Sequence, residues 1–124
     1  MTAKAPLLLL SLIAIAPAPS SAQVAVHLTG HSAADDTLQN DIVKTIALYG
    51  AAFDCPAPSE ITASMLNSSM IPTSLRKPSL NTSYERWDAT FCAKRYSFFV
   101  TFYPDPNGGS FLGVQYPYPP NAPR

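Results

Sequence analysis

Residues 84–116 constrain the fold more than any other stretch, because most of the chain's aromatic residues lie there. At its start, residues 84–91 alternate between two kinds of side chain with a period of two, which is the pattern of a strand with one buried face. One side consists of Trp87, Ala89 and Phe91, and the opposite side consists of Tyr84, Arg86, Asp88 and Thr90. Residues 84–91 are therefore predicted to form a half-buried strand.

Two further runs in this stretch, residues 96–103 and 110–116, are rich in aromatic and β-branched residues. Residues 104–109 between them contain two prolines, an asparagine and two glycines, a composition typical of a turn. We therefore expect a hairpin. Both faces of the run 96–103 are bulky, which predicts a central strand with a helix on one side and partial cover on the other.

Residues 37–49 are predicted to form an amphipathic helix. Asp36 is expected to be its N-cap, with Gln39 at the third helical position reaching back to the amide of the cap. Gly50 is expected to end the helix in the left-handed conformation. The apolar stripe of the helix comprises Leu38, Ile42, Thr45, Ile46 and Tyr49. We expect this stripe to pack on the aromatic sheet, which is the only large apolar surface in the sequence.

The first 22 residues have the features of a secretory signal peptide. Lys4 precedes an apolar run at residues 5–16, and prolines and small residues then lead to a predicted cleavage site after Ala22. The alternative is a membrane anchor, but a run of about twelve apolar residues is too short for a hydrocarbon core about 30 Å thick. We therefore expect a secreted or periplasmic protein with no stable membrane insertion after cleavage.

Removal of residues 1–22 would leave 102 residues, enough for one small domain. The loss of Lys4 would leave seven basic and eight acidic residues, and hence a net charge of −1. This balance gives no electrostatic reason to expect a nucleic-acid partner. Acidic residues dominate the first half of the remaining chain and basic residues the second, so the helix and the sheet are expected to present opposite charges.

The two cysteines, Cys55 and Cys92, predict a disulfide bond. An even number of cysteines in an exported chain favours a bridge over a metal site or a nucleophilic thiol. The alternative is a pair of free structural thiols. A bridge would tie the segment that follows the helix to the aromatic sheet.

Four segments lie outside the predicted helix and the three predicted aromatic strands. Residues 23–34 show no sustained period and are expected to form a flexible N-terminal arm, or an edge strand at best. Residues 59–70 favour a short helix or an irregular segment, with a strand beginning at Ile61 as the alternative. Residues 68–83 are rich in Ser, Asn and Pro and predict a surface loop. Residues 117–124 predict a polyproline II tail that adds no core.

The sequence therefore predicts a single α+β domain over residues 35–116. Its expected architecture is one N-terminal amphipathic helix packed on a three- to four-stranded antiparallel sheet. A single disulfide would hold the two layers together.

His27 and His31, followed by Asp35 and Asp36, are the candidate metal ligands. On a helix, this spacing would present two imidazoles and a carboxylate to a divalent cation. Gly30 interrupts the spacing, and the segment is expected to be flexible. No metal or cofactor is therefore expected.

Glu85 and Asp88 are the candidate carboxylate pair for glycoside hydrolysis. Arg86 and Lys94 lie close in the sequence, and ordinary ion pairing accounts for all four residues. The sequence also lacks the Gly-x-Ser-x-Gly motif of serine hydrolases. Catalysis is therefore not the favoured interpretation.

A set of aromatic residues is the remaining candidate site, because aromatic side chains that are exposed together can bind sugars or proteins. These residues are Tyr84, Trp87, Phe99, Tyr103 and Tyr116. The favoured hypothesis is a non-catalytic module that binds another exported protein, an envelope component or a glycan through this sheet face. The alternatives are a small hydrolase or metal-dependent enzyme that uses the N-terminal histidines, and a structural or stress-related envelope protein.

Overall fold

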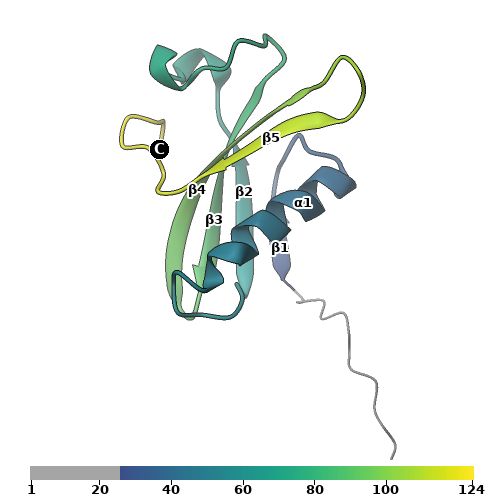
Figure 1. Ribbon diagram of the computed structural model, residues 1–124. Coiled ribbons are helices and arrows are strands. Elements are labelled where there is room, and N and C mark those ends of the chain that lie inside the picture. Colours follow the sequence, from purple (N-terminus) through teal and green to yellow (C-terminus); the bar gives the residue numbers. More distant parts are fainter. Residues whose placement is uncertain (1–25) are drawn as a thin grey trace, which may run out of the picture.

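The computed structural model describes residues 26–124, which form one helix packed on one sheet (Figure 1). The predicted signal peptide and its cleavage site after Ala22 lie outside the described residues. The α+β class is confirmed, and so is the single disulfide.

The sheet has five strands in the order β1-β2-β3-β4-β5. β1 runs parallel to β2, and the other neighbouring strands are antiparallel. The prediction of a three- to four-stranded antiparallel sheet is therefore wrong, and so is the N-terminal position of the helix, since β1 precedes it. The strands are β1 (His27–Gly30), β2 (Glu60–Met65), β3 (Ser83–Phe91), β4 (Lys94–Pro104) and β5 (Ser110–Gln115).

The parallel pairing of β1 with β2 follows from the way the helix connects them. Parallel neighbours need a long crossover connection, and here the helix and its following loop supply it. Residues 27–30 thus form an edge strand rather than an arm. The strand is short, and three of its four residues are exposed, so it leaves no clear pattern in the sequence.

The helix α1 (Asp36–Ala47) begins one residue earlier than predicted and continues into the 3-10 turn Leu48–Gly50. Asp35 is the N-cap in place of Asp36, because its carboxylate accepts the Leu38 N–H at 2.8 Å. The Gln39 side chain does reach back, but it donates to the Ala34 carbonyl at 2.8 Å. Two neighbouring aspartates compete for the cap, and sequence spacing alone does not separate them.

Gly50 lies within the 3-10 turn and does not adopt the predicted left-handed conformation. A glycine is required there because the backbone of Cys55 approaches closely. A Cβ at position 50 would lie 2.4 Å from the Cys55 carbonyl oxygen, and the Cys55 N–H donates to the Gly50 carbonyl at 2.9 Å.

The main core lies between α1 and the sheet (Figure 1). Ile42 and Ile46 of the helix are fully buried there. Burying a side chain of this size is worth roughly 1.5–3 kcal/mol, which explains why the predicted stripe faces the sheet. From the strands, the core takes Ile61, Ala63, Trp87, Ala89, Phe91, Phe98, Val100 and Phe102. The prediction that this helix packs on the aromatic strands is confirmed.

A second, smaller core covers the opposite face of the sheet. Its buried residues come from the loop after β2, from β3 and β4, and from the C-terminal tail: Ile71, Tyr84, Phe99, Tyr118 and Ala122. The prediction that residues 117–124 add no core is therefore wrong. The Ala122 N–H donates to the Pro119 carbonyl at 3.1 Å, so the prolines turn the tail back onto the sheet rather than extending it.

Residues 60–65 form β2, so the favoured short helix is wrong and the alternative, a strand, is correct. Ile61 and Ala63 point to the core, and the intervening Thr62 points away from it. Six residues are too few for their alternation to stand out in the sequence. The predicted loop at 68–83 is confirmed apart from two short 3-10 turns, Ser68–Met70 and Thr73–Leu75, and the first residue of β3.

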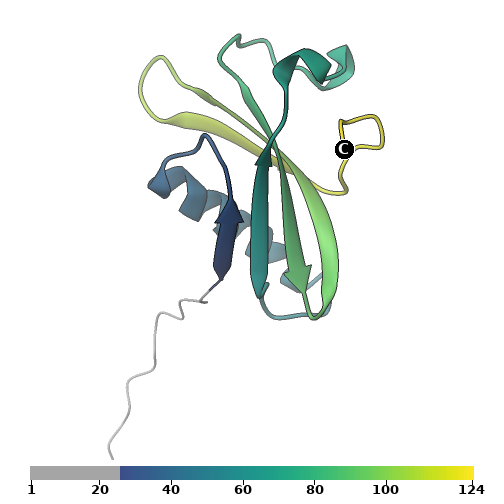
Figure 2. The ribbon, with the colours of Figure 1, turned by 180° about the vertical axis from the view of Figure 1, so that it is seen from behind.

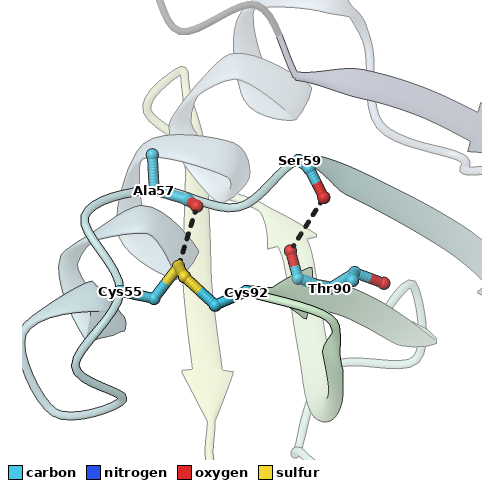
Figure 3. The surroundings of a disulfide bond; sticks show 5 residues. All are labelled: Cys55, Ala57, Ser59, Thr90 and Cys92. Atoms are coloured by element: carbon cyan, nitrogen blue, oxygen red, sulfur yellow. Dashed lines mark hydrogen bonds between the residues drawn. A yellow bond between two sulfur atoms is a disulfide. The ribbon is translucent and has the colours of Figure 1, made fainter.

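The disulfide joins Cys55, in the loop after α1, to Cys92, in the turn between β3 and β4 (Figure 3). The two Cα atoms are 5.9 Å apart. The Cys55 sulfur also lies 3.4 Å from the Ala57 carbonyl oxygen, a contact rather than a hydrogen bond because a disulfide has no S–H. Ser59 extends the link through its backbone N–H, which donates to the Thr90 carbonyl at 2.9 Å.

Replacing both cysteines, Cys55→Ala with Cys92→Ala, should lower the free energy of unfolding by about 4 kcal/mol. The bridge spans 37 positions in the sequence, and its loss frees that loop in the unfolded state. Urea unfolding of the double variant and of the oxidised wild type measures the loss, and the reduced wild type, which also lacks the bridge, is the control. Two alkylatable thiols in the native protein would contradict the bridge itself.

Candidate ligand-binding groove

The five aromatic residues predicted to form a binding face do not share one exposed surface. Trp87 is fully buried in the main core, on the helix side of the sheet. Tyr84 and Phe99 are buried on the opposite side, beneath the loop and the tail. Tyr116 packs on the main core, and its ring lies 5.2 Å from that of Phe98. Only Tyr103 remains beside an exposed aromatic neighbour.

Tyr118 of the tail occupies the outer aromatic face. Its ring meets the ring of Phe99 edge-on at 5.9 Å, and its hydroxyl donates to the Pro123 carbonyl. The guanidinium groups of Arg86 and Arg124 lie over it at 5.2 Å and 5.9 Å. Burial raises the pKa of the Tyr118 phenol, and the two arginines partly oppose this effect. The chain's own tail thus covers the surface on which the sequence predicted a ligand.

The candidate metal ligands do not converge. His27 lies on β1, where its register partner is Glu60, and the backbone of His31 donates to the Ala63 carbonyl at 3.0 Å. The Asp35 carboxylate is occupied as the helix cap. Within residues 26–124, no group of three or more His, Cys, Asp or Glu side chains is placed to hold a metal ion.

Glu85 and Asp88 do not form a carboxylate pair either, because residues three apart on a strand point to opposite faces. Asp88 lies on the outer face, where it pairs with Arg86 at 3.0 Å and accepts a hydrogen bond from the Ser97 hydroxyl at 2.5 Å. Glu85 points to the helix side and is fully buried.

The buried Glu85 carboxylate accepts three hydrogen bonds. Its Oε1 accepts from the Ser32 hydroxyl at 2.7 Å and from the Trp87 indole N–H at 2.8 Å. Its Oε2 accepts from the backbone N–H of Ala33 at 2.7 Å. Ser32 and Ala33 belong to the connection between β1 and α1, so the carboxylate fastens this connection to β3. Each of these hydrogen bonds joins parts of the fold to one another, and Glu85 is inaccessible to solvent.

A groove on the outer face of the sheet is the clearest site for a ligand. Its floor is formed by β4 and β5, and its wall by the loop of residues 74–77. The central hollow has a volume of about 380 Å³, within the range of ligand sites. It is lined by Ser74, Leu75, Arg76, Lys77, Phe99, Thr101, Gly113, Val114 and Gln115. We call this hollow and its extension past Tyr103 and Phe111 the outer groove.

The extension of the outer groove has a volume of about 230 Å³ and carries the exposed aromatic pair. The rings of Tyr103 and Phe111 lie 5.0 Å apart, and Phe111 is 49% exposed. Lys77, Thr101 and Gly113 line both the central hollow and the extension. The two hollows are therefore continuous along the face of β4 and β5.

Gly113 shapes the floor where the two hollows meet. It faces Thr101 in the register of β4 and β5, and a Cβ at position 113 would lie 3.1 Å from the Thr101 hydroxyl oxygen. Any larger side chain would project into the outer groove. The glycine therefore keeps a gap open between Phe111 and Gln115 on the same face of β5.

The two basic residues of the groove wall are used differently. Arg76 points back into its own loop, where its Nε donates to the Ile71 carbonyl at 2.8 Å. Lys77 is held through its backbone, since its N–H donates to the Tyr84 hydroxyl at 2.9 Å. In the part of the chain that the structure describes, Arg86–Asp88 is the only ion pair. The ammonium group of Lys77 therefore has no carboxylate partner there.

Comparison with known protein families, with curated protein sequences and with solved structures found no match for this chain. Among residues 26–124, no helix is long and apolar enough to cross a membrane. The functional interpretation thus depends on the outer groove itself. Sequence reasoning missed this groove, because its wall and its floor are far apart in the chain and only the basic pair Arg76-Lys77 marked its position.

The substitution Glu85→Gln should lower the free energy of unfolding by about 1–3 kcal/mol. Glutamine has one carbonyl oxygen, so its amide NH₂ would face a hydrogen-bond donor at one of the two positions that the carboxylate oxygens now occupy. Glu60→Gln, at an exposed position, should change the stability by less than about 0.5 kcal/mol. Equal unfolding midpoints for the two variants would contradict the structural role of Glu85.

Tyr118 should make the fold sensitive to alkaline pH. Because its pKa is raised in the folded state, the neutral phenol contributes stability that is fully present below the ordinary pKa of about 10. This contribution is lost as the pH rises through the raised value. Tyr118→Phe should therefore lose less stability between pH 9 and pH 11 than the wild type, and should remove one component from the tyrosinate absorbance titration. Identical pH profiles would contradict this assignment.

Proposed function

We propose that the protein is an exported, non-catalytic binding module whose ligand lies in the outer groove. The observation that carries this proposal is the position of Lys77, an exposed lysine that lines three hollows around the loop. A cation that has no ion-pair partner among the described residues, beside a continuous groove, is available to a ligand. Export rests on the signal peptide predicted for residues 1–22.

The chemistry of the groove lining favours binding over catalysis. The residues that line the three hollows around Lys77 include no His, Cys, Asp or Glu. Such side chains are the usual general acids, general bases and nucleophiles of enzymes. The lining instead combines hydroxyl, amide and aromatic groups with a cation, which suits recognition of a polar ligand.

The position of the groove also modifies the original hypothesis about the aromatic face. Tyr84 and Phe99 are buried beneath the loop and the tail, and Phe99 also lines the central hollow. Tyr103 is the one residue of the predicted set that lines the extension of the groove, and Phe111 joins it from the next strand. The proposed binding surface is therefore the end of the outer sheet face that the tail leaves uncovered.

Amide chemical-shift mapping on residues 23–124 tests this proposal. The probes are a fixed panel of neutral oligosaccharides, acidic oligosaccharides, and acidic and neutral peptides. At least one probe should shift the amides of Lys77, Thr101 and Gly113, and Lys77→Ala should weaken the binding of an acidic probe that does so. Lys94→Ala, an exposed lysine at the far end of β4, is the matched control and should leave this binding unchanged.

Shifts confined to α1 or β1 would contradict the proposed site. The absence of any shift across the whole panel would contradict the proposed function.

A further inference from the structure

We propose that the ligand of the outer groove is a short oligosaccharide that contains uronic acid residues. In this arrangement, a sugar carboxylate pairs with Lys77 and a neighbouring sugar ring packs on the Tyr103–Phe111 pair. This inference rests on the proposed function and specifies its ligand class. Three features of the outer groove carry it: the charge, the aromatic pair and the polar lining.

The charge of the groove determines the sign of the ligand. Lys77 is exposed, lines both hollows of the outer groove, and pairs with no carboxylate of residues 26–124. No acidic side chain lines either hollow. An anionic group in the groove would therefore meet a cation without a competing negative charge. A charge-assisted hydrogen bond between ammonium and carboxylate is about twice as strong as a neutral one.

The aromatic pair favours a ligand with an apolar face. Phe111 is about half exposed, although it is large and apolar, and it lies against the ring of Tyr103. A sugar ring presents C–H groups on its faces and hydroxyl groups around its edge. It can therefore bury the exposed part of the aromatic pair while its hydroxyl groups remain hydrogen-bonded.

The polar lining matches the hydroxyl groups of a sugar. Ser74, Thr101 and Gln115 line the central hollow, and each side chain can both donate and accept hydrogen bonds. The gap at Gly113 lets a ring approach the floor between Phe111 and Gln115. A carboxylate on one sugar and a stacked neighbouring ring would thus span the two continuous hollows.

An acidic peptide is the competing ligand, and the geometry favours it less. Extended peptides usually bind to a sheet by adding a strand, which requires the backbone N–H and C=O groups at a strand edge. These groups lie in the plane of the sheet, whereas the outer groove lies above the side chains of β4 and β5. A peptide in the groove would leave its own backbone groups without the partners that strand addition provides.

Titration of residues 23–124 with oligogalacturonate tests the inference, and its methyl ester is the uncharged control. The acid should bind at least tenfold more tightly than the ester, and both should shift the amides of Thr101 and Gly113. Lys77→Ala should weaken binding of the acid about 10- to 100-fold, which corresponds to one charge-assisted hydrogen bond. The same variant should leave binding of the ester unchanged.

Two further variants test the other parts of the site. Phe111→Ala should weaken binding of the acid and binding of the ester by equal factors, because it removes the stacking surface and leaves the charge of Lys77. Leu80→Ala, at a fully exposed position outside the outer groove, should leave the binding of both probes unchanged.

The alternative outcomes separate the two proposals. Equal affinity for the acid and the ester, or tighter binding of a tetraglutamate peptide at the same amides, would overturn the uronic acid inference and leave the binding function intact. No binding of any probe at the groove would overturn both.

Discussion

The buried carboxylate of Glu85 is the interaction on which the arrangement of the other elements depends. A carboxylate without solvent is costly unless all of its hydrogen-bond partners are present at once. Here the partners come from Trp87 on β3 and from Ser32 and Ala33, just after β1. The N-terminal strand, the start of α1 and the centre of the sheet must therefore come together in one arrangement. This requirement holds the short strand β1, which has few apolar contacts of its own, in place.

The second constraint is that both faces of the sheet carry aromatic residues, while residues 26–124 contain only one α-helix to cover them. α1 covers one face of the sheet (Figure 1). In the view from the opposite side, the strands lie in front of the helix, and the loop after β2 and the C-terminal segment lie beside the strands (Figure 2). The loop supplies Ile71 and the tail supplies Tyr118 to the second core. Tyr103 and Phe111 are not part of this second core, and the outer groove extends from the loop and Phe99 to these two residues.

Sequence patterns predicted the elements whose residues repeat over many positions. The helix and strands β3 and β4 belong to this group. The turn residues at 104–109 predicted β5, and the even number of cysteines predicted the disulfide. β1 and β2 were predicted only as alternatives, because four and six residues without a strong turn signal beside them are too few to establish a period. The tail was misjudged because its prolines imply an extended chain, whereas Tyr118 gains more by packing on Phe99. The outer groove could not be predicted, because Lys77 and Gly113 meet only through the folding of the loop.

The loop that forms the groove wall is itself positioned by the second core. Tyr118 packs edge-on against Phe99 at 5.9 Å, and Phe99 lies 6.1 Å from the ring of Tyr84. The Tyr84 hydroxyl then accepts the backbone N–H of Lys77. This series of contacts connects the C-terminal tail to the cation of the groove, with each step buried or partly buried. Asn121 adds a direct link, since its amide donates to the Ser74 hydroxyl at 3.2 Å. The tail therefore covers one part of the outer face and, through the same contacts, holds Lys77 at the edge of the part that it leaves open.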